Sequence, residues 1–287
     1  MPPFRISLLS LGKAGPSQLI EEAILADQLN FHRFWVTEHH SNLADSCLPV
    51  LIAAIAGKTQ RVRVGSGGIL LNLHNPLLIA EAFATLEELY PNRIDLGICR
   101  GGLDPETSAV LLDGKKITNP VEYYADRVRV LLAAANSGQL GGLAKGGVLP
   151  GAWVLGQGVN SMRLAASLGL AYSHSLFHAG AIDDPQVIRE YHLLLKSHFP
   201  ENPVHASIAV AGICAETDSA ANLLLDQHTN DFIIPTVVGS QRSCLEQLTE
   251  IYEQYQIEEI HFLDLCQGMK DKTESMTLIS ELPLFNE

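Results

Sequence analysis

The sequence predicts an α/β fold, a closed (β/α)8 TIM barrel formed by residues 1–287 as a single domain. Short apolar runs alternate eight times with longer amphipathic runs, which is typical of parallel strands covered by helices on both faces. A length of 287 residues suits eight such units. An open doubly wound sheet, the structural alternative, needs a glycine-rich G-x-G-x-x-G turn after its first strand, and the segment LGKAGPS at 11–17 does not match it.

The first half of the chain supplies four strands and three helices. Helices are predicted at 16–30, 48–59 and 76–90, where apolar residues recur at helical spacing and proline lies near each start. The helix at 48–59, LPVLIAAIAGKT, is almost entirely apolar. The intervening runs predict strands at 4–11, 33–39, 61–71 and 93–101.

The pattern is weaker in the second half. A helix at 123–138 is followed by a glycine-rich loop at 141–151. The remaining strands are predicted at 152–158, 171–177, 205–216 and 258–265, and the remaining helices at 160–170, 184–199, 218–228 and 240–256.

Composition excludes several classes of protein. The formal charge of −13 argues against a nucleic-acid or anionic-membrane surface, and 18 % charged residues against disorder. Five widely spaced cysteines without a C-x-x-C pair indicate reduced thiols and a cytoplasmic protein. The N-terminal run lacks a basic region and is predicted to be the first strand, and no apolar run reaches about 18 residues, the length of a membrane span.

Functional residues of such barrels lie at the carboxyl ends of the strands. The residues at those positions are Glu38, His39 and His40 after strand two, Gly67, Gly68 and His74 at strand three, Cys99, Arg100 and Gly101 after strand four, Gly156, Gln157 and Gly158 after strand five, and His174 and Phe177 on strand six.

The segment Glu38-His39-His40 suggests proton transfer, because a histidine titrates near neutral pH. At a strand end, one imidazole can face the barrel mouth while the carboxylate holds the other. A metal site that recruits His74, His174 and Asp264 remains open, although neither H-x-H nor H-E-x-x-H occurs. A polar strand-to-loop junction without a ligand is the third interpretation.

Two glycine segments and two arginines suggest a flat, phosphorylated ligand. Gly67-Gly68 is either a bulge or a place where a planar ring approaches the backbone. The turn 156–161 precedes a helix, whose first amides favour a phosphate. Arg100 can supply a guanidinium to that phosphate; for Arg127, a second phosphate contact and an ordinary surface salt bridge are equally consistent with the sequence.

These residues belong to longer stretches that resemble the bacterial luciferase-like flavin-dependent monooxygenases. The most specific is TEHH at 37–40 together with VRVGSGGILLNLHNPLLIAEAFATLEELYPNRIDLGICRG at 62–101. Three further matching stretches are VLGQGVNSMRLAASLGLAYSHSLF, AGICAETDSAANLL and VVGSQRSCLEQLTEIYEQYQIEEI. The resemblance implies a (β/α)8 barrel that binds reduced FMN, or in one branch of the family a deazaflavin, at its carboxyl-terminal mouth.

The resemblance also assigns roles to individual residues. It implies that a histidine of the pair His39-His40 assists the flavin–oxygen chemistry, with Cys99 near the reactive ring edge. It implies a non-proline cis peptide at Gly67-Gly68, behind the isoalloxazine. The other positions implied to contact the cofactor are Glu38, Arg100, Arg127, Gln157, Gly158, Ser161 and Phe177, with the arginines, Gly158 and Ser161 near the phosphate.

The implied activity is a monooxygenase that takes reduced FMN from a separate flavin reductase and uses O2 on an aldehyde, ketone or metabolite intermediate. A homodimer that buries the apolar helix 48–59 is expected. The chain is shorter than typical relatives after strand four (103–121), in the glycine-rich loop (139–151) and after strand seven (229–237), and the third region leaves little chain for a lid. Three alternatives therefore stay open: a flavin- or deazaflavin-dependent oxidoreductase without oxygen activation, a non-catalytic flavin-binding protein, and a metal-dependent barrel hydrolase using His39, His40 and His174.

Overall fold

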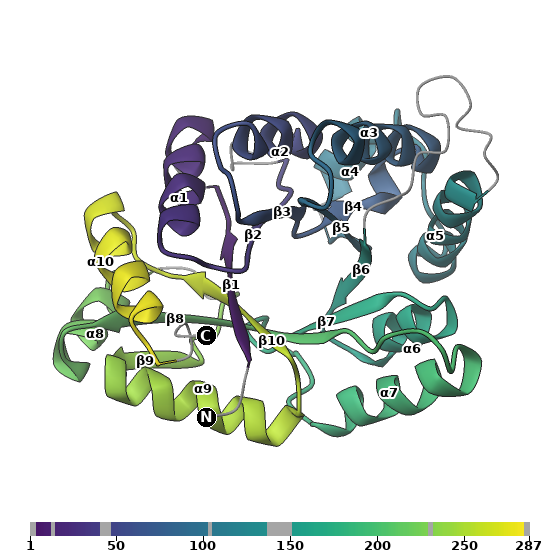
Figure 1. Cartoon of the computed structure of the whole chain (residues 1–287). Helices are drawn as coiled ribbons and strands as arrows, with labels where there is room; N and C mark the ends of the chain where they lie inside the picture. Colours follow the sequence, from purple (N-terminus) through teal and green to yellow (C-terminus); the bar gives the residue numbers. More distant parts are fainter. Residues whose placement is uncertain are drawn as a thin grey trace.

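A computed structural model describes residues 4–12, 15–40, 47–102, 105–136, 151–228 and 232–283. Within these residues, eight parallel strands close into a barrel because β10 pairs with both β1 and β8 (Figure 1). The predicted fold class is therefore confirmed. The barrel strands are β1 (Arg5–Ser10), β2 (Arg33–Val36), β3 (Arg63–Ser66), β5 (Ile94–Cys99), β6 (Gly151–Gly156), β7 (Ala171–Ser175), β8 (Ala206–Ala215) and β10 (Glu259–Asp264).

Helices form a ring outside the strands (Figure 1). Their bounds are α1 (Pro16–Gln28), α2 (Leu48–Ala56), α3 (Pro76–Leu89), α4 (Pro105–Leu111), α5 (Pro120–Asn136), α6 (Val159–Ser167), α7 (Gln186–His198), α8 (Asp218–Leu225), α9 (Gln241–Tyr255) and α10 (Met269–Ser280). The sequence analysis did not predict α4 or α10. None of the helices in the described ranges is long and apolar enough to cross a bilayer. Most of the predicted glycine-rich loop, 141–150, lies outside the described residues.

The predicted strand at 61–71 is not continuous. β3 ends at Ser66, the Gly67–Gly68 peptide bond is cis, and β4 (Ile69–Leu70) then pairs with β5 alone. A short 3-10 helix, η1 (Leu71–Leu73), follows. The sequence analysis also did not predict β9 (Val237–Ser240), which pairs with the carboxyl-terminal end of β8.

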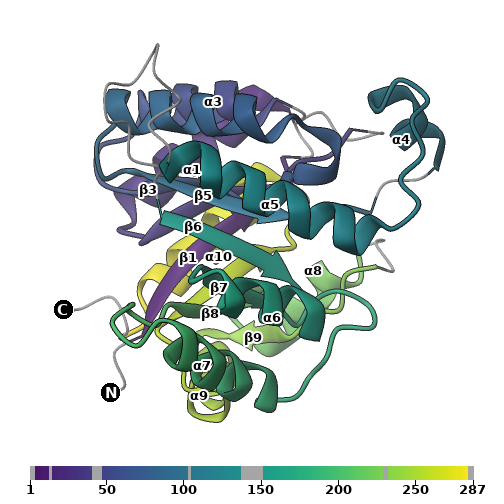
Figure 2. The ribbon, with the colours of Figure 1, turned by 90° about the vertical axis from the view of Figure 1, so that its right-hand side faces the viewer.

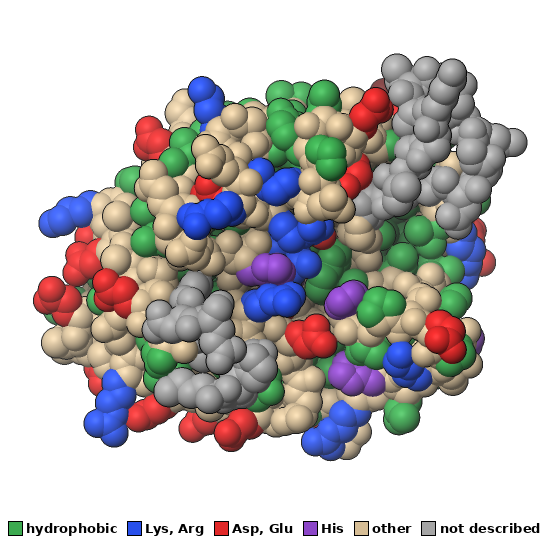
Figure 3. Space-filling view, in the orientation of Figure 1, with side chains coloured by type: hydrophobic (Ala, Val, Ile, Leu, Met, Phe, Trp, Pro, Cys, Tyr) green, Lys and Arg blue, Asp and Glu red, His purple; other side chains and the backbone are tan. Residues whose placement is uncertain are grey.

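The amino-terminal half of the barrel interior is filled by side chains. Trp35 and Trp153 cross at a ring-centroid distance of 5.8 Å, and Gly65 makes room for them because a Cβ there would lie 2.6 Å from the Trp35 ring. Below them, Arg33 bridges the carboxylates of Asp95, at 2.9 Å, and Glu259. Basic side chains gather near the centre of this amino-terminal face (Figure 3). In Figure 2 the arrow of β6 points away from it, to the end where the candidate site lies.

Candidate active site at the carboxyl ends of the strands

His39 follows the end of β2 and contacts Thr37. β2 ends at Val36, one residue after Trp35 of the interior cluster, and Thr37 and His39 follow Trp35 at every second position. The Thr37 hydroxyl donates to the Ser10 carbonyl at 3.3 Å and lies 3.0 Å from Nδ1 of His39. The Thr37–His39 contact holds the imidazole ring in place, and which of its two atoms donates depends on the tautomer of His39.

Glu38 and His40 occupy the alternate positions. Glu38 is only 3 % exposed, and its Oε1 lies 2.5 Å from Nε2 of both His40 and His74. Oε2 accepts the Leu70 amide at 2.7 Å. Burial opposes ionisation of Glu38, but the hydrogen bonds from His74, Leu70 and His40 outweigh it and lower the pKa. Glu38 is thus a carboxylate that ties the end of β2 to the chain after Gly68.

Glu38 and its two histidine partners also have the spacing of metal ligands. The ligand atoms of Glu38, His40 and His74 lie within 4.8 Å of one another. His174, which the hydrolase interpretation requires, is not part of this group among the described residues. Its ring is fully buried, with Nδ1 2.7 Å from the Tyr172 hydroxyl and Nε2 2.7 Å from the Ile182 carbonyl.

Gly67 and Gly68 form a wall without side chains. A Cβ on Gly67 would lie 2.8 Å from Leu9, and one on Gly68 would lie 2.9 Å from the Gly97 carbonyl. Packing therefore requires glycine at Gly68, whereas a Cβ at Gly67 would displace the tip of the Leu9 side chain. Their peptide bond is cis, as the family resemblance implies. Cys99 lies beside this wall, where its thiol donates to the Gly68 carbonyl at 3.6 Å. Burial, with a smaller effect from Glu38, raises the pKa of Cys99 to about 12, so the thiol stays protonated at neutral pH.

The two candidate phosphate arginines differ in their surroundings. Arg100, at the end of β5, is exposed and makes no hydrogen bond or ion pair within the described ranges. Arg127, on α5, donates to the Leu71 carbonyl and the Tyr123 hydroxyl, each at 2.8 Å. Its guanidinium also lies 4.9 Å from the Tyr123 ring centre. Arg127 braces η1, whereas Arg100 is the cation that remains available to a ligand.

The turn between β6 and α6 has the features of an anion site. Gly158 is the N-cap of α6 and provides no side-chain cap, so amides of the first helical turn can bind a ligand. The Ser161 hydroxyl donates to the Gly158 carbonyl at 2.8 Å and occupies the space that a Cβ on Gly156 would need. The carbonyl of Gln157, whose side chain is exposed, accepts the Ile182 amide at 3.2 Å.

A histidine that the sequence analysis did not select lies on the β7 side. Phe177 is 4 % exposed and packs in the interior cluster. The next residue, His178, is exposed, and its Nδ1 lies 2.6 Å from the Ser175 hydroxyl. The spacing Ser-x-x-His at a strand end was the available signal, but a polar residue in a loop is too common to stand out.

The short connection after β8 reaches this histidine. His178 and Ile233 form an antiparallel bridge, and the Ile234 amide donates to the Phe177 carbonyl at 2.7 Å. Residues 229–231 lie outside the described ranges. The described part, 232–236, is a short strap along the chain after β7 rather than a long lid, in keeping with the expected shortening.

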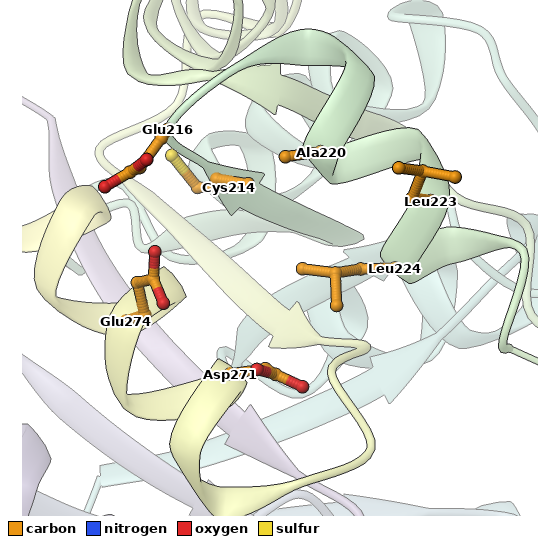
Figure 4. A pocket seen from close by; sticks show the side chains of 8 residues that line it. Cys214, Glu216, Ala220, Leu223, Leu224, Asp271 and Glu274 are labelled. Atoms are coloured by element: carbon orange, nitrogen blue, oxygen red, sulfur yellow. The ribbon is translucent and has the colours of Figure 1, made fainter.

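A pocket of about 280 Å³ lies between α8 and α10. Its lining combines apolar side chains such as Ala220 and Leu224 with the carboxylates of Glu216, Asp271 and Glu274 (Figure 4). Three carboxylates disfavour a phosphate. The wall at Gly67–Gly68 and the turn before α6 are therefore better suited to an anionic cofactor than this pocket.

Comparisons with known proteins agree with this geometry. The model of the family described as "Luciferase-like monooxygenase" matches residues 3–259. An uncharacterized protein of Bacillus subtilis, YvbT, is 32 % identical over 241 residues, which cover 80 % of this chain and 70 % of YvbT. A luciferase-like monooxygenase of Escherichia coli is 31 % identical over 229 residues, covering 76 % of this chain and 66 % of that protein. The N-acetyl-S-alkylcysteine monooxygenase of Bacillus subtilis is 27 % identical over 296 residues, covering 96 % and 86 %.

Solved structures show the same architecture. Apo-MsnO8 is 30 % identical and superposes with a TM-score of 0.81 over 97 % of this chain and 98 % of its own. The oxygenating constituent of 3,6-diketocamphane monooxygenase from a Pseudomonas putida plasmid, in complex with FMN, has a TM-score of 0.74 at 16 % identity and 98 % coverage of both chains. An F420-dependent secondary alcohol dehydrogenase has a TM-score of 0.73 at 15 % identity over the whole of both chains. The last two support the fold alone, whereas the family match covers most of the sequence, and the chain therefore belongs to the luciferase-like monooxygenase family.

Proposed function

We propose that this protein is a flavin-dependent monooxygenase that receives reduced FMN from a separate reductase and oxidises a small organic substrate with O2. The observation that carries the proposal is a single arrangement at the mouth. A flat wall without side chains at Gly67–Gly68 lies at the same end of the barrel as an uncapped helix start, Arg100 and the imidazole of His39. A site for a phosphorylated flavin needs a flat surface for the ring, a binding site for the phosphate and a side chain that accepts a proton.

The residues present fit an FMN molecule. The ring system would lie along the backbone of Gly67–Gly68, which carries no side chains, and beside Cys99. The phosphate would be held by the first amides of α6 and the guanidinium of Arg100. When bound, the flavin supplies the oxygen-activating chemistry.

The side chains around the ring have separate tasks. His39 would serve as the proton acceptor, with its ring held by the contact of Nδ1 with the Thr37 hydroxyl. Cys99 would lie beside the ring as a neutral thiol, since its pKa is raised to about 12. Glu38, which contacts His40 and the Leu70 amide, would hold the segment after Gly68 in place.

The test is to mix the purified protein with reduced FMN under anaerobic conditions and then with O2. We expect saturable binding, reoxidation slower than that of free reduced FMN, and less hydrogen peroxide per flavin when substrate is present. N-acetyl-S-alkylcysteines are the first substrates to try, because a relative covering 96 % of this chain bears that name; aldehydes and ketones follow. Reoxidation at the rate of free flavin with every substrate would contradict oxygen activation.

A flavin- or deazaflavin-dependent oxidoreductase without oxygen activation is the second candidate. The short connection 232–236 after β8 favours it, because this connection offers little chain to cover the mouth, and oxygen activation on flavins needs water to be excluded. Turnover with reduced deazaflavin in the absence of O2 would identify this activity. A protein that uses reduced FMN only in the presence of O2 would rule it out.

A further inference from the structure

We propose that His178 is a substrate-binding residue that donates a hydrogen bond from Nε2 to an oxygen of the substrate, on the side of the mouth opposite His39. This inference rests on the proposed function and extends it to a substrate class. The class is a mostly apolar molecule that carries a carbonyl or carboxylate oxygen.

The first argument is the position of the two histidines in the barrel. From β2 to β7, the path runs through β3, β5 and β6 in one direction and through β1, β10 and β8 in the other (Figure 1). Four steps in each direction place the two strands on opposite sides of an eight-stranded barrel. His39 follows β2 and His178 follows β7, so the two imidazoles lie across the mouth from each other.

The second argument is that the Ser175 side chain points into the barrel. Ser175 pairs with Ala209, a member of the interior cluster. Two residues earlier on the same face, the Ser173 hydroxyl lies 3.2 Å from Nδ1 of the buried His261. Because Nδ1 of His178 lies 2.6 Å from the Ser175 hydroxyl, the His178 ring is held over the open end and not on the outer wall.

The hydrogen bond also selects the tautomer. Ser175 is 7 % exposed, and its hydroxyl proton needs an acceptor. Among the described residues that acceptor is Nδ1 of His178, so the imidazole proton is on Nε2. The imidazole of His178 therefore offers a donor on the side of the mouth opposite His39.

The His178 ring is fixed well enough to confer specificity. It stacks on Phe177 with ring centroids 4.4 Å apart. The His178 carbonyl accepts the Ala181 amide at 3.0 Å, and its backbone is bridged to Ile233. A preorganised donor of this kind binds an oxygen acceptor with little loss of side-chain entropy. Burial lowers the pKa of His178, which keeps the ring neutral at neutral pH.

The apolar surroundings limit the rest of the substrate. The interior cluster that contains Phe177 and Ile233 also contains Leu9, Ala211 and Leu265. Leu9 lies near the carboxyl end of β1, Ala211 lies in the middle of β8, where it pairs with Leu263, and Leu265 directly follows β10. A substrate between His178 and the flavin wall therefore meets mainly carbon atoms apart from its one oxygen contact.

The tautomer is tested by long-range ¹H–¹⁵N spectra of the histidine side chains, with the His178 signals assigned through His178→Gln. We expect protonated Nε2 in the natural protein and a mixture of tautomers in Ser175→Ala. Protonated Nδ1 in the natural protein would overturn the inference.

Binding is tested on the FMN-loaded protein with acetophenone and α-methylstyrene, which differ only by C=O against C=CH₂. Dissociation constants come from chemical-shift titrations. We expect the preference for acetophenone to fall about tenfold in His178→Phe, the worth of one hydrogen bond, and to be retained in His178→Gln, which keeps a donor. FMN affinity should be the same in all three proteins.

The two levels of failure are distinguishable. If the natural protein binds no FMN in either redox state, the proposed function fails before any His178 variant is compared. If FMN binds but His178→Phe leaves the ratio of the two dissociation constants unchanged, only the role of His178 is wrong.

Discussion

His39 and His40 are neighbours in sequence but contact different residues at the strand end. His39 contacts Thr37, whereas His40 contacts the buried Glu38. The sequence raised this division of roles without saying which histidine takes which role. The answer depended on the inward direction of Trp35, since a shift of one residue exchanges the two faces of a strand.

His39→Ala and His40→Ala are therefore expected to differ. His39→Ala should leave FMN affinity unchanged and lower turnover about 100-fold or more, as expected for loss of a general base. His40→Ala should lower the free energy of unfolding by about 1–3 kcal/mol, because Glu38 stays buried with one partner fewer. Titration with FMN, thermal melting and reoxidation kinetics separate the two. Equal, mild effects of both substitutions would contradict this assignment.

Arg100 and Arg127 provide a matched pair for the phosphate. Arg100→Ala should weaken FMN binding by about 10- to 100-fold, the worth of a charge-assisted hydrogen bond, and leave riboflavin binding unchanged. Arg127→Ala should lower the melting temperature, because the Leu71 carbonyl loses its donor, and should keep the ratio of FMN to riboflavin affinity. Fluorescence titration with both ligands is the measurement. An equal loss of both ligands in Arg100→Ala would rule out a phosphate contact.

At the scale of elements, the regular alternation of apolar runs made the eight barrel strands predictable. α4 was missed because none of its side chains is buried. Its sequence therefore has no apolar residues at helical spacing that would predict a helix. α10 buries only Met276 and Ile279 among its larger side chains, and its many polar residues hide the helical period. β9, with four residues directly before α9, was missed as well.

The pattern of apolar residues did not predict the break between β3 and β4, for a different reason. Glycine has no side chain and so no preferred face, and the run 61–71 looks like one long strand. What interrupts it is the close approach of Gly68 to the Gly97 backbone. That contact joins segments about 30 residues apart, which no local pattern encodes.

Gly68→Ala tests the wall directly. The new methyl group would lie 2.9 Å from the Gly97 carbonyl oxygen, an overpacking expected to cost about 1–3 kcal/mol and to weaken FMN binding. Gly102→Ala is the control, since a Cβ there meets nothing within 4 Å, and it should melt like the natural protein. A Gly68→Ala protein with unchanged melting temperature and FMN affinity would contradict the close packing of this wall.

At the scale of the whole molecule, the two ends of the barrel differ in kind. The amino-terminal end is filled by the ion pairs of Arg33 with Asp95 and Glu259. The carboxyl-terminal end holds the bare wall, the uncapped helix and the two mouth histidines. This polarity was predictable because it belongs to the fold. His178 was not, because its position depends on the pairing of the chain after β7 with residues 232–236.

We propose a homodimer that uses the surface of α2. That helix buries Leu51, Ile52 and Ile55 against its own barrel but leaves Val50 63 % exposed. Val50→Glu should therefore convert a dimer of about twice 31.1 kDa into a monomer. Leu193→Glu, on α7 and 74 % exposed, is the control and should stay dimeric. Light scattering after gel filtration measures both, and a monomeric natural protein would rule the dimer out.

The pairing of β10 with β1 has a consequence for synthesis in the cell. These strands begin at Glu259 and Arg5, so the ring cannot seal until β10 has emerged from the ribosome. During translation the growing sheet presents two open edges, at β1 and at its most recent strand, that invite association with other nascent chains. Folding of this protein during translation should for that reason depend on chaperones until its last strand is free.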